Sequence, residues 1–169
     1  MKVSEALQSR ISCRAFLPDP PEERVVRRIL DLAKQAPSGG NLQPWRVWAL
    51  AGPALAALKA EVAAEAADRP MGHAPEYRIY PDPLIDPFNA RRRQCAEDVY
   101  ATIGVPRDDR IGRRAHFARN FMFFGAPVAL FIYFDRTMGP PQWADTGMFL
   151  QSVMLAAREE GLHTCAQEA

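Results

Sequence analysis

The sequence predicts a single α+β domain over residues 1–169. Several stretches carry apolar residues at helical spacing, and two short stretches, 46–50 and 126–134, have the apolar character of strands. The chain has 169 residues, of which 48% are hydrophobic, so it can bury one sizeable core. We therefore expect one domain that combines helices with a small number of strands.

Charge and cysteine usage exclude several classes of protein. The net charge is +1, and acidic residues intersperse with the basic ones at 91–93 and 110–114, which disfavours nucleic acid as a partner. The longest apolar run, 126–134, is too short to span a membrane. Three cysteines lie far apart and the first residues lack a signal-peptide core, so we expect a cytoplasmic protein with reduced thiols and no membrane partner.

The chain begins with a predicted short helix over residues 1–9, followed by an extended segment over 10–16. Alternation in this segment places Arg10, Ser12 and Arg14 on one side. Two guanidinium groups and a hydroxyl together suit an anion such as phosphate. The alternative is an ordinary solvated edge.

A second helix is predicted from Pro20 to Ala36, with Asp19 as its N-cap and an apolar stripe along one face. A strand follows at 46–50, and Gly52 and Pro53 open another amphipathic helix. The inward positions of that helix are expected to be Leu55, Leu58, Val62 and Ala66.

The segment 36–45 has the composition of a binding site. Pro37 prevents the preceding helix from continuing, and two glycines at 39 and 40 permit close approach of the backbone. Asn41 and Gln43 each offer an amide donor beside an acceptor, which suits the pyrimidine edge of a flavin. The alternative is a polar turn between a helix and a strand.

Residues 69–89 are rich in proline and show no regular pattern, which predicts a long loop that could act as a lid. Helices are predicted at 89–103 and 107–123, the latter with four residues facing inward: Ile111, Ala115, Ala118 and Met122.

The last third of the chain contains an expected central strand and a long helix. Residues 126–134 do not alternate, which predicts a strand buried on both faces. Residues 142–160 are apolar around most of the helix, and Gly161 is expected to end it as a C′ glycine. A strand or turn is expected from 163 to 169.

Several common motifs are absent from the sequence. There is no Gly-x-Gly-x-x-Gly stretch after a strand, no Walker lysine and no Gly-x-Ser-x-Gly elbow. The three histidines lack partners at metal-ligand spacing, so we expect no metal site.

Together these segments resemble the nitroreductase family of FMN-dependent oxidoreductases. The resemblance is carried by Arg10, Ser12 and Arg14, by the segment 36–45, by the helix ending at Gly161, and by 117–121 and 124–127. It implies a central, mainly antiparallel mixed sheet flanked by helices, and a homodimer with FMN at the interface. It also implies a chain that continues past residue 169, so the C-terminal part is expected to be missing.

The resemblance further implies roles for individual residues. Arg10 and Ser12 would hold the FMN phosphate and ribityl chain, and Arg14 would lie beside flavin N1. The partner subunit would supply four residues, namely Pro37, Ser38, Asn41 and Gln43. Further neighbours of the pocket would be Gln142, Trp143, Glu168 and Ala169, the last standing where glycine is more usual.

The implied activity is ping-pong reduction of nitroaromatic, quinone or similar acceptors by NADH or NADPH, with FMN rather than a side chain carrying the chemistry. Three alternatives stay open at this point: an FMN-binding protein without turnover, a dehalogenating or flavin-consuming relative, and a basic module for nucleic acid. The natural acceptor and the choice between NADH and NADPH are left open.

Overall fold

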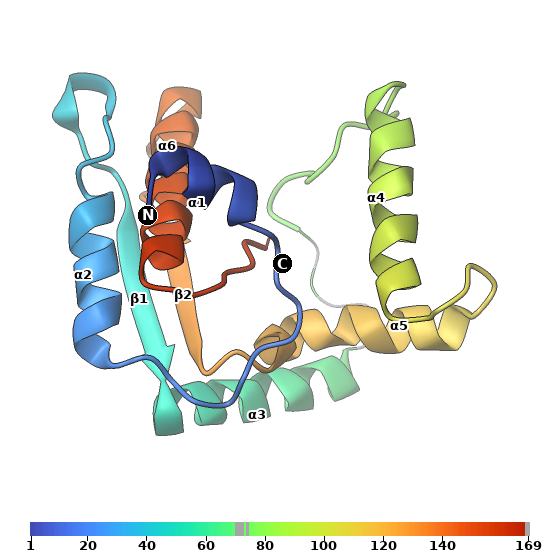
Figure 1. Ribbon diagram of the computed structural model, residues 1–169. Coiled ribbons are helices and arrows are strands. Elements are labelled where there is room, and N and C mark those ends of the chain that lie inside the picture. Colours follow the sequence, from blue (N-terminus) through green and yellow to red (C-terminus); the bar gives the residue numbers. More distant parts are fainter. Residues whose placement is uncertain (70–72, 74, 168–169) are drawn as a thin grey trace. The chain divides into compact units, whose positions relative to one another are not determined.

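The computed structural model describes residues 1–69, 73 and 75–167. Contacts divide the described chain, drawn as a ribbon in Figure 1, into two units. Unit 1 comprises residues 1–58 and 125–166, and unit 2 comprises the described residues of 59–124 together with Gln167. The prediction of one domain over the whole chain therefore stays a prediction.

Unit 1 contains the sheet and the helices that pack on it. Its helices are α1 (Val3–Ser9), α2 (Glu23–Ala33), the short 3-10 turn η1 (Gly39–Asn41) and α6 (Pro140–Glu159), and α3 (Gly52–Asp68) begins in it. Strands β1 (Arg46–Ala51) and β2 (Val128–Tyr133) pair antiparallel, with Trp48 opposite Phe131. Ser12 and Thr164 form a separate parallel bridge outside this antiparallel sheet.

The core of unit 1 lies between α2, α6 and one face of the sheet. In α6, Phe149, Val153 and Ala157 recur every four residues, which places them in one stripe of the helix. This stripe contacts Ile29 and Ala33 of α2, together with Trp45, and partly buried residues of the two strands pack against it: Val47, Leu130 and Ile132. The apolar faces of α2 and α6 and one face of the sheet are thus buried against one another, which stabilises both the helices and the sheet.

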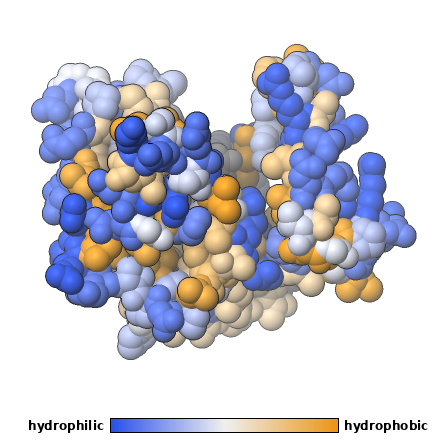
Figure 2. Space-filling view, viewed as in Figure 1, coloured by the Kyte–Doolittle hydropathy of each residue, from blue (hydrophilic) through white to orange (hydrophobic). Residues whose placement is uncertain are grey.

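The opposite face of the sheet is exposed in the single chain. Trp48 is 63% exposed, Tyr133 40% and Phe131 38%. The prediction that 126–134 is buried on both faces is therefore wrong for this chain, because the core formed with α2 and α6 covers the face that carries Val47, Leu130 and Ile132. Figure 2 shows hydrophobic side chains lying among hydrophilic ones over the visible surface.

Helix ends follow local chemistry in one case and not in another. Gly161 has φ of 75°, its N–H donates to Arg158 and the Leu162 N–H donates to Ala157, which is the Schellman arrangement predicted by a C′ glycine. At the other end of the chain, α2 begins at Glu23 with Glu22 as its N-cap. The predicted cap at Asp19 is wrong, because the prolines at 20 and 21 lie before the helix rather than in its first turn.

Unit 2 contains the rest of α3, then α4 (Phe88–Thr102), α5 (Arg110–Ala118) and the 3-10 segment η2 (Arg119–Gly125). The last residue of η2, Gly125, belongs to unit 1. The described residues between 69 and 87 form neither helix nor strand. The predicted helix over 107–123 is shorter than expected, because Phe123 and Phe124 take positive φ and the chain tightens after Ala118. Its orientation is also wrong: Ile111 is 84% exposed, and Ala115, Ala118 and Met122 are exposed as well.

The face of α5 that turns toward α4 is polar and cationic. Arg113 forms a two-pronged ion pair with Glu97 of α4, with N–O distances of 3.0 and 2.6 Å. The same guanidinium lies 4.2 Å from the centre of the Tyr100 ring, and its Nε donates to the Pro106 carbonyl. The hydrogen bond from Arg113 lowers the pKa of Glu97, and the same bond raises the pKa of Arg113. Arg113 of α5 thus joins the two helices through polar and cation–π contacts with Glu97 and Tyr100 of α4.

We expect Glu97→Gln to lower the thermal unfolding midpoint, since it removes the charge that Arg113 binds. The pKa of Glu97 in the folded chain lies below its ordinary value of 4.5, so the stabilisation is present above that value and is lost as the pH falls through the folded pKa. Melting curves across an acid pH series should therefore show a gap between the two proteins at neutral pH that closes in acid. Glu61→Gln, an exposed carboxylate of α3, is the control; equal gaps at every pH would contradict the assignment.

Candidate functional site

The loop from Ser38 to Gln43 has an unusual backbone. Gly40 and Asn41 have φ of 57°, and Gln43 has φ of 47°, so three residues lie in the left-handed region within four positions. Glycine adopts this region freely and asparagine tolerates it, but for Gln43 it is sparsely populated and must be held by the surroundings. Such backbone strain gathers at ligand-binding sites.

Hydrogen bonds inside the loop hold this conformation. The Gln43 N–H donates to Ser38 Oγ at 2.9 Å, and the Asn41 N–H donates to the Ser38 carbonyl at 3.0 Å. Because Ser38 binds the loop to itself, the side chains of Asn41 and Gln43 remain exposed. Pro37 is exposed at the entrance to the loop. Both residues whose amides the sequence singled out are thus exposed on this loop.

A buried carboxylate beneath this loop was missed at the sequence level. Asp145 of α6 is 5% exposed, and both of its oxygens lie within hydrogen-bond distance of the Gly39 N–H, at 3.3 and 3.2 Å. A signal for it was available: one acid stands four residues before Phe149, in a helix that is otherwise apolar over most of its surface. A buried charge requires a partner, and here that partner is the loop.

The second group of candidate residues lies where the N-terminal segment meets the end of the chain. Ser12 bridges Thr164 in parallel, and the Cys13 N–H donates to the Thr164 carbonyl at 3.0 Å. Arg10 directly follows α1 and, like Arg14, is half-buried, whereas Ser12 is exposed. The alternating pattern predicted for 10–16 is thus realised over a single bridge rather than a full strand.

The pKa of the Cys165 thiol depends on the charged groups near this bridge. Burial raises its pKa, while the positive charges of Arg14 and Arg10 oppose that rise and the neighbouring Cys13 adds to it. Both guanidinium groups therefore act on the same small region, although they are four positions apart in the sequence. A ligand that brings negative charge to this region would be stabilised by both.

Thr164, which pairs with Ser12 in the bridge, was not predicted as a site residue. Its Oγ1 is buried and has no hydrogen-bond partner among the described residues. Because this oxygen has almost no exposed surface, a ligand cannot reach it, and the hydroxyl of Thr146 is likewise buried without a partner in the described part of the chain. The donor set suited to a phosphate is therefore the two guanidinium groups together with the exposed Ser12.

Four further residues were predicted to line the site: Gln142, Trp143, Glu168 and Ala169. The Gln142 side chain accepts a hydrogen bond from the Gly139 N–H at 3.0 Å and so caps its own helix. Trp143 is 50% exposed and packs edge-on against Phe134, with ring centres 4.8 Å apart. Glu168 and Ala169 lie outside the described residues.

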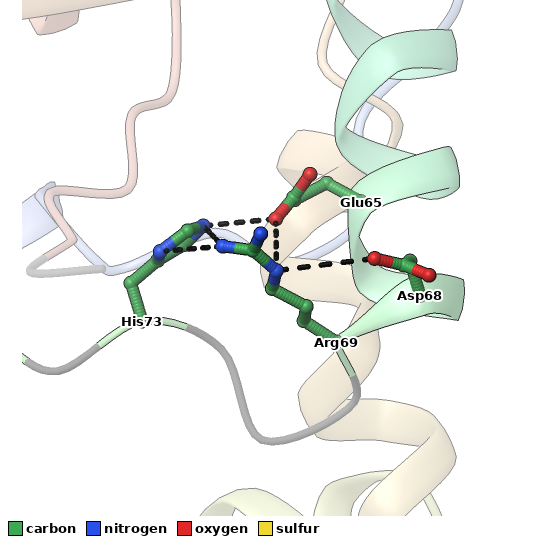
Figure 3. Close-up of polar contacts among 4 residues, drawn as sticks. All are labelled: Glu65, Asp68, Arg69 and His73. Carbon is green, nitrogen blue, oxygen red and sulfur yellow. Dashed lines mark hydrogen bonds and ion pairs between the residues drawn. The ribbon is translucent and has the colours of Figure 1, made fainter.

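Unit 2 contains a polar cluster formed by Glu65, Asp68, Arg69 and His73. His73 Nε2 lies 2.9 Å from Glu65 Oε1, and Arg69 Nε lies 3.3 Å from the same oxygen and 3.8 Å from Asp68 (Figure 3). All four side chains are more than half exposed, which is typical of a solvated network. Among the described residues, no three metal-binding side chains gather anywhere. Nor does the described chain contain a helix that is both long and apolar enough to cross a membrane.

Comparison with known proteins gives a consistent result. The model of the Nitroreductase family matches residues 7–169. The nitrobenzene nitroreductase of Ectopseudomonas oleovorans is 36% identical over 165 residues, which cover 98% of this chain and 73% of that protein.

Solved structures agree in fold. The FMN and NADPH-dependent nitroreductase NfnB from sphigopyxis sp. strain HMH is 49% identical with a TM-score of 0.96, over 99% of this chain and 75% of that one. NfnB from Mycobacterium smegmatis, solved in complex with NADPH, is 27% identical with a TM-score of 0.86, over 96% of this chain and 73% of that one. The chain described here belongs to the nitroreductase family.

Proposed function

We propose that this protein is an FMN-dependent oxidoreductase that takes electrons from NADPH or NADH and reduces nitroaromatic compounds, quinones or similar acceptors in a ping-pong cycle. The observation that carries the proposal is the likeness to the FMN and NADPH-dependent nitroreductase from sphigopyxis sp. strain HMH, which extends over 99% of the chain at 49% identity. Relatives named for reducing nitrobenzene and 4-nitrobenzoate are 36% and 37% identical.

In this proposal the segment from Arg10 to Arg14, which pairs with Thr164, binds the phosphate end of FMN. Arg10 and Ser12 hold the phosphate and ribityl chain, and Arg14 lies beside flavin N1. Although burial raises the pKa of the Cys165 thiol, Arg14 and Arg10 both act to lower it, and this supports one anionic ligand beside both guanidinium groups. Arginine is suited to this role because its planar fork matches phosphate oxygens.

The loop from Ser38 to Gln43, called the amide loop from here on, binds the pyrimidine edge of the flavin. Asn41 and Gln43 present donor and acceptor groups side by side, as the carbonyl and N–H groups of the pyrimidine edge require. Pro37 and Ser38 shape the loop around them, with Ser38 closing it through Gln43. We assign these four residues to the FMN of the partner subunit.

Other residues complete the pocket. Gln142 and Trp143 stand at the start of α6, and we place Trp143, half-exposed, on the side where an acceptor enters. Glu168 and Ala169 are proposed to lie near flavin N5, and residues 69–89 to cover the site as a lid. The chemistry that FMN supplies when bound is electron transfer between a nicotinamide and the acceptor. The protein's own part is to orient the two substrates in turn and exclude water.

We further propose a cytoplasmic homodimer. The exposed face of the sheet, with Trp48, Phe131 and Tyr133, is the kind of apolar surface that a second subunit covers. If two subunits build each site, flavin binding and dimer formation are coupled. Analytical ultracentrifugation should then show a dimer whenever FMN is bound, and a monomer with full FMN occupancy would contradict the shared site.

The activity is tested by anaerobic reduction. Adding NADPH to the FMN-loaded protein should bleach the yellow flavin absorption, and nitrobenzene added afterwards should restore it. Repeating the reduction with NADH gives the preference between the two nucleotides. A yellow protein that neither nucleotide bleaches would show that the chain binds FMN without turnover, and the proposed activity would be wrong.

A further inference from the structure

We propose that Asp145 is a positioning residue: its carboxylate sets the geometry of the loop over residues 39–43 and thereby the direction of the Asn41 and Gln43 amides. The inference rests on the proposed function in so far as those amides bind FMN. The anchoring of the loop is a separate statement that can be tested without any flavin.

The first observation is the isolation of this carboxylate. Asp145 is the one buried charged residue in the described part of the chain, at 5% exposed. Both of its oxygens accept from the same donor, the Gly39 N–H. Burying a carboxylate is costly unless it is well bound, so a residue that only filled the core would be apolar. A polar acceptor at this buried position is explained if its hydrogen bond to the loop is what the site requires.

The second observation is that the same helix holds the other end of the loop. Phe149 lies four residues after Asp145, so both side chains point from the same face of α6. The Phe149 ring stacks on Trp45, with ring centres 4.9 Å apart and an angle of 11° between the planes. One turn of α6 therefore fixes Gly39 at the start of the loop and Trp45 just beyond its end.

The third observation is the strain between these two anchors. Gln43 holds positive φ, which a residue with a long side chain rarely adopts, and Asn41 holds it as well, although asparagine tolerates it better. The hydrogen bonds within the loop are local, and Asp145 is the long-range polar contact, 106 positions from Gly39. Without it, the loop is expected to relax toward common backbone angles, and the two amides would no longer present one fixed set of donors and acceptors.

The test separates the hydrogen bond from the charge. Asp145→Ala removes both, whereas Asp145→Asn keeps an acceptor oxygen in place and loses only the charge. We expect Asp145→Ala to weaken FMN binding by about tenfold or more, the effect of losing one hydrogen bond to a charged group. Asp145→Asn should recover most of that affinity. Glu159→Gln, an exposed carboxylate at the end of the same helix, is the matched control and should bind FMN as the parent protein does.

A second readout needs no cofactor. Hydrogen exchange in the flavin-free protein should become faster in the peptide covering residues 38–43 of Asp145→Ala, and stay unchanged in peptides from α2 and from β1. Asp145→Asn, which keeps the acceptor, should exchange nearly as the parent does and remains measurable if the alanine variant fails to fold.

The outcomes are distinct. A parent protein that binds no FMN would overturn the proposed function, while the exchange measurement would still decide the anchoring. A parent that binds FMN and a folded Asp145→Ala with unchanged affinity and exchange would overturn the inference alone. An Asp145→Asn variant as impaired as the alanine variant in both measurements would also overturn it, because the charge rather than positioning would then be at work.

Discussion

Phe149→Ala is expected to lower the free energy of unfolding by about 3–5 kcal/mol, the usual cost of truncating a fully buried aromatic side chain. Phe149 is 1% exposed and stands at the centre of the core of unit 1, between Ile29 and Ala33 of α2 and the ring of Trp45. Its removal leaves a cavity that the rigid helix pair cannot close, and it also frees the Trp45 end of the amide loop. Loss of stability and loss of FMN affinity should therefore appear together.

Urea unfolding followed by tryptophan fluorescence measures the first effect. Met148→Ala is the matched control, because Met148 is the preceding residue on α6 and is 40% exposed, so its truncation should change stability little. Phe149→Leu should lie between the two, since it retains part of the apolar volume. Equal stability for Phe149→Ala and Met148→Ala would contradict the described core.

Arg14→Ala is expected to lower the midpoint potential of bound FMN by tens of millivolts. In the proposed site the Arg14 guanidinium lies beside flavin N1, where reduction places negative charge. At about 4 Å and an effective dielectric constant near 20, such a cation contributes on the order of 4 kcal/mol before desolvation is subtracted. For a two-electron couple about 1.4 kcal/mol corresponds to roughly 30 mV, so even a fraction of that energy is measurable.

A spectroscopic redox titration against a reference dye gives the potential directly. Arg14→Lys keeps the charge and should retain most of the parent potential. Arg24→Ala removes an exposed arginine of α2, with a side chain 80% exposed, and should leave the potential unchanged. A potential in Arg14→Ala equal to that of the parent would remove Arg14 from this role.

The amide loop was predictable from sequence because its signals are local. Pro37 stops the helix, glycine supplies positive φ and a tryptophan closes the segment, and each acts through its own backbone or ring. The end of α6 was predictable for the same reason, since Gly161 alone specifies a Schellman motif. The pairing of Arg10, Ser12 and Arg14 on one side was suggested by alternation, and the structure reduces it to one bridge with Thr164.

Features that depend on distant partners could not be predicted. The apolar pattern of α5 suggested that Ile111 faces inward, but the Arg113 contact with Glu97 and Tyr100 turns the helix the other way. The composition of β2 suggested burial on both faces, yet composition does not say what covers each face. Asp145 was missed because its partner is a backbone N–H that lies 106 positions away.

The central claim is that short, separate segments of this chain combine to bind FMN. The most direct test is the visible spectrum of the purified protein after incubation with excess FMN and gel filtration. Our account predicts a yellow protein that retains FMN through the column, with two flavins per dimer. A colourless protein that still fails to retain added FMN would contradict the account.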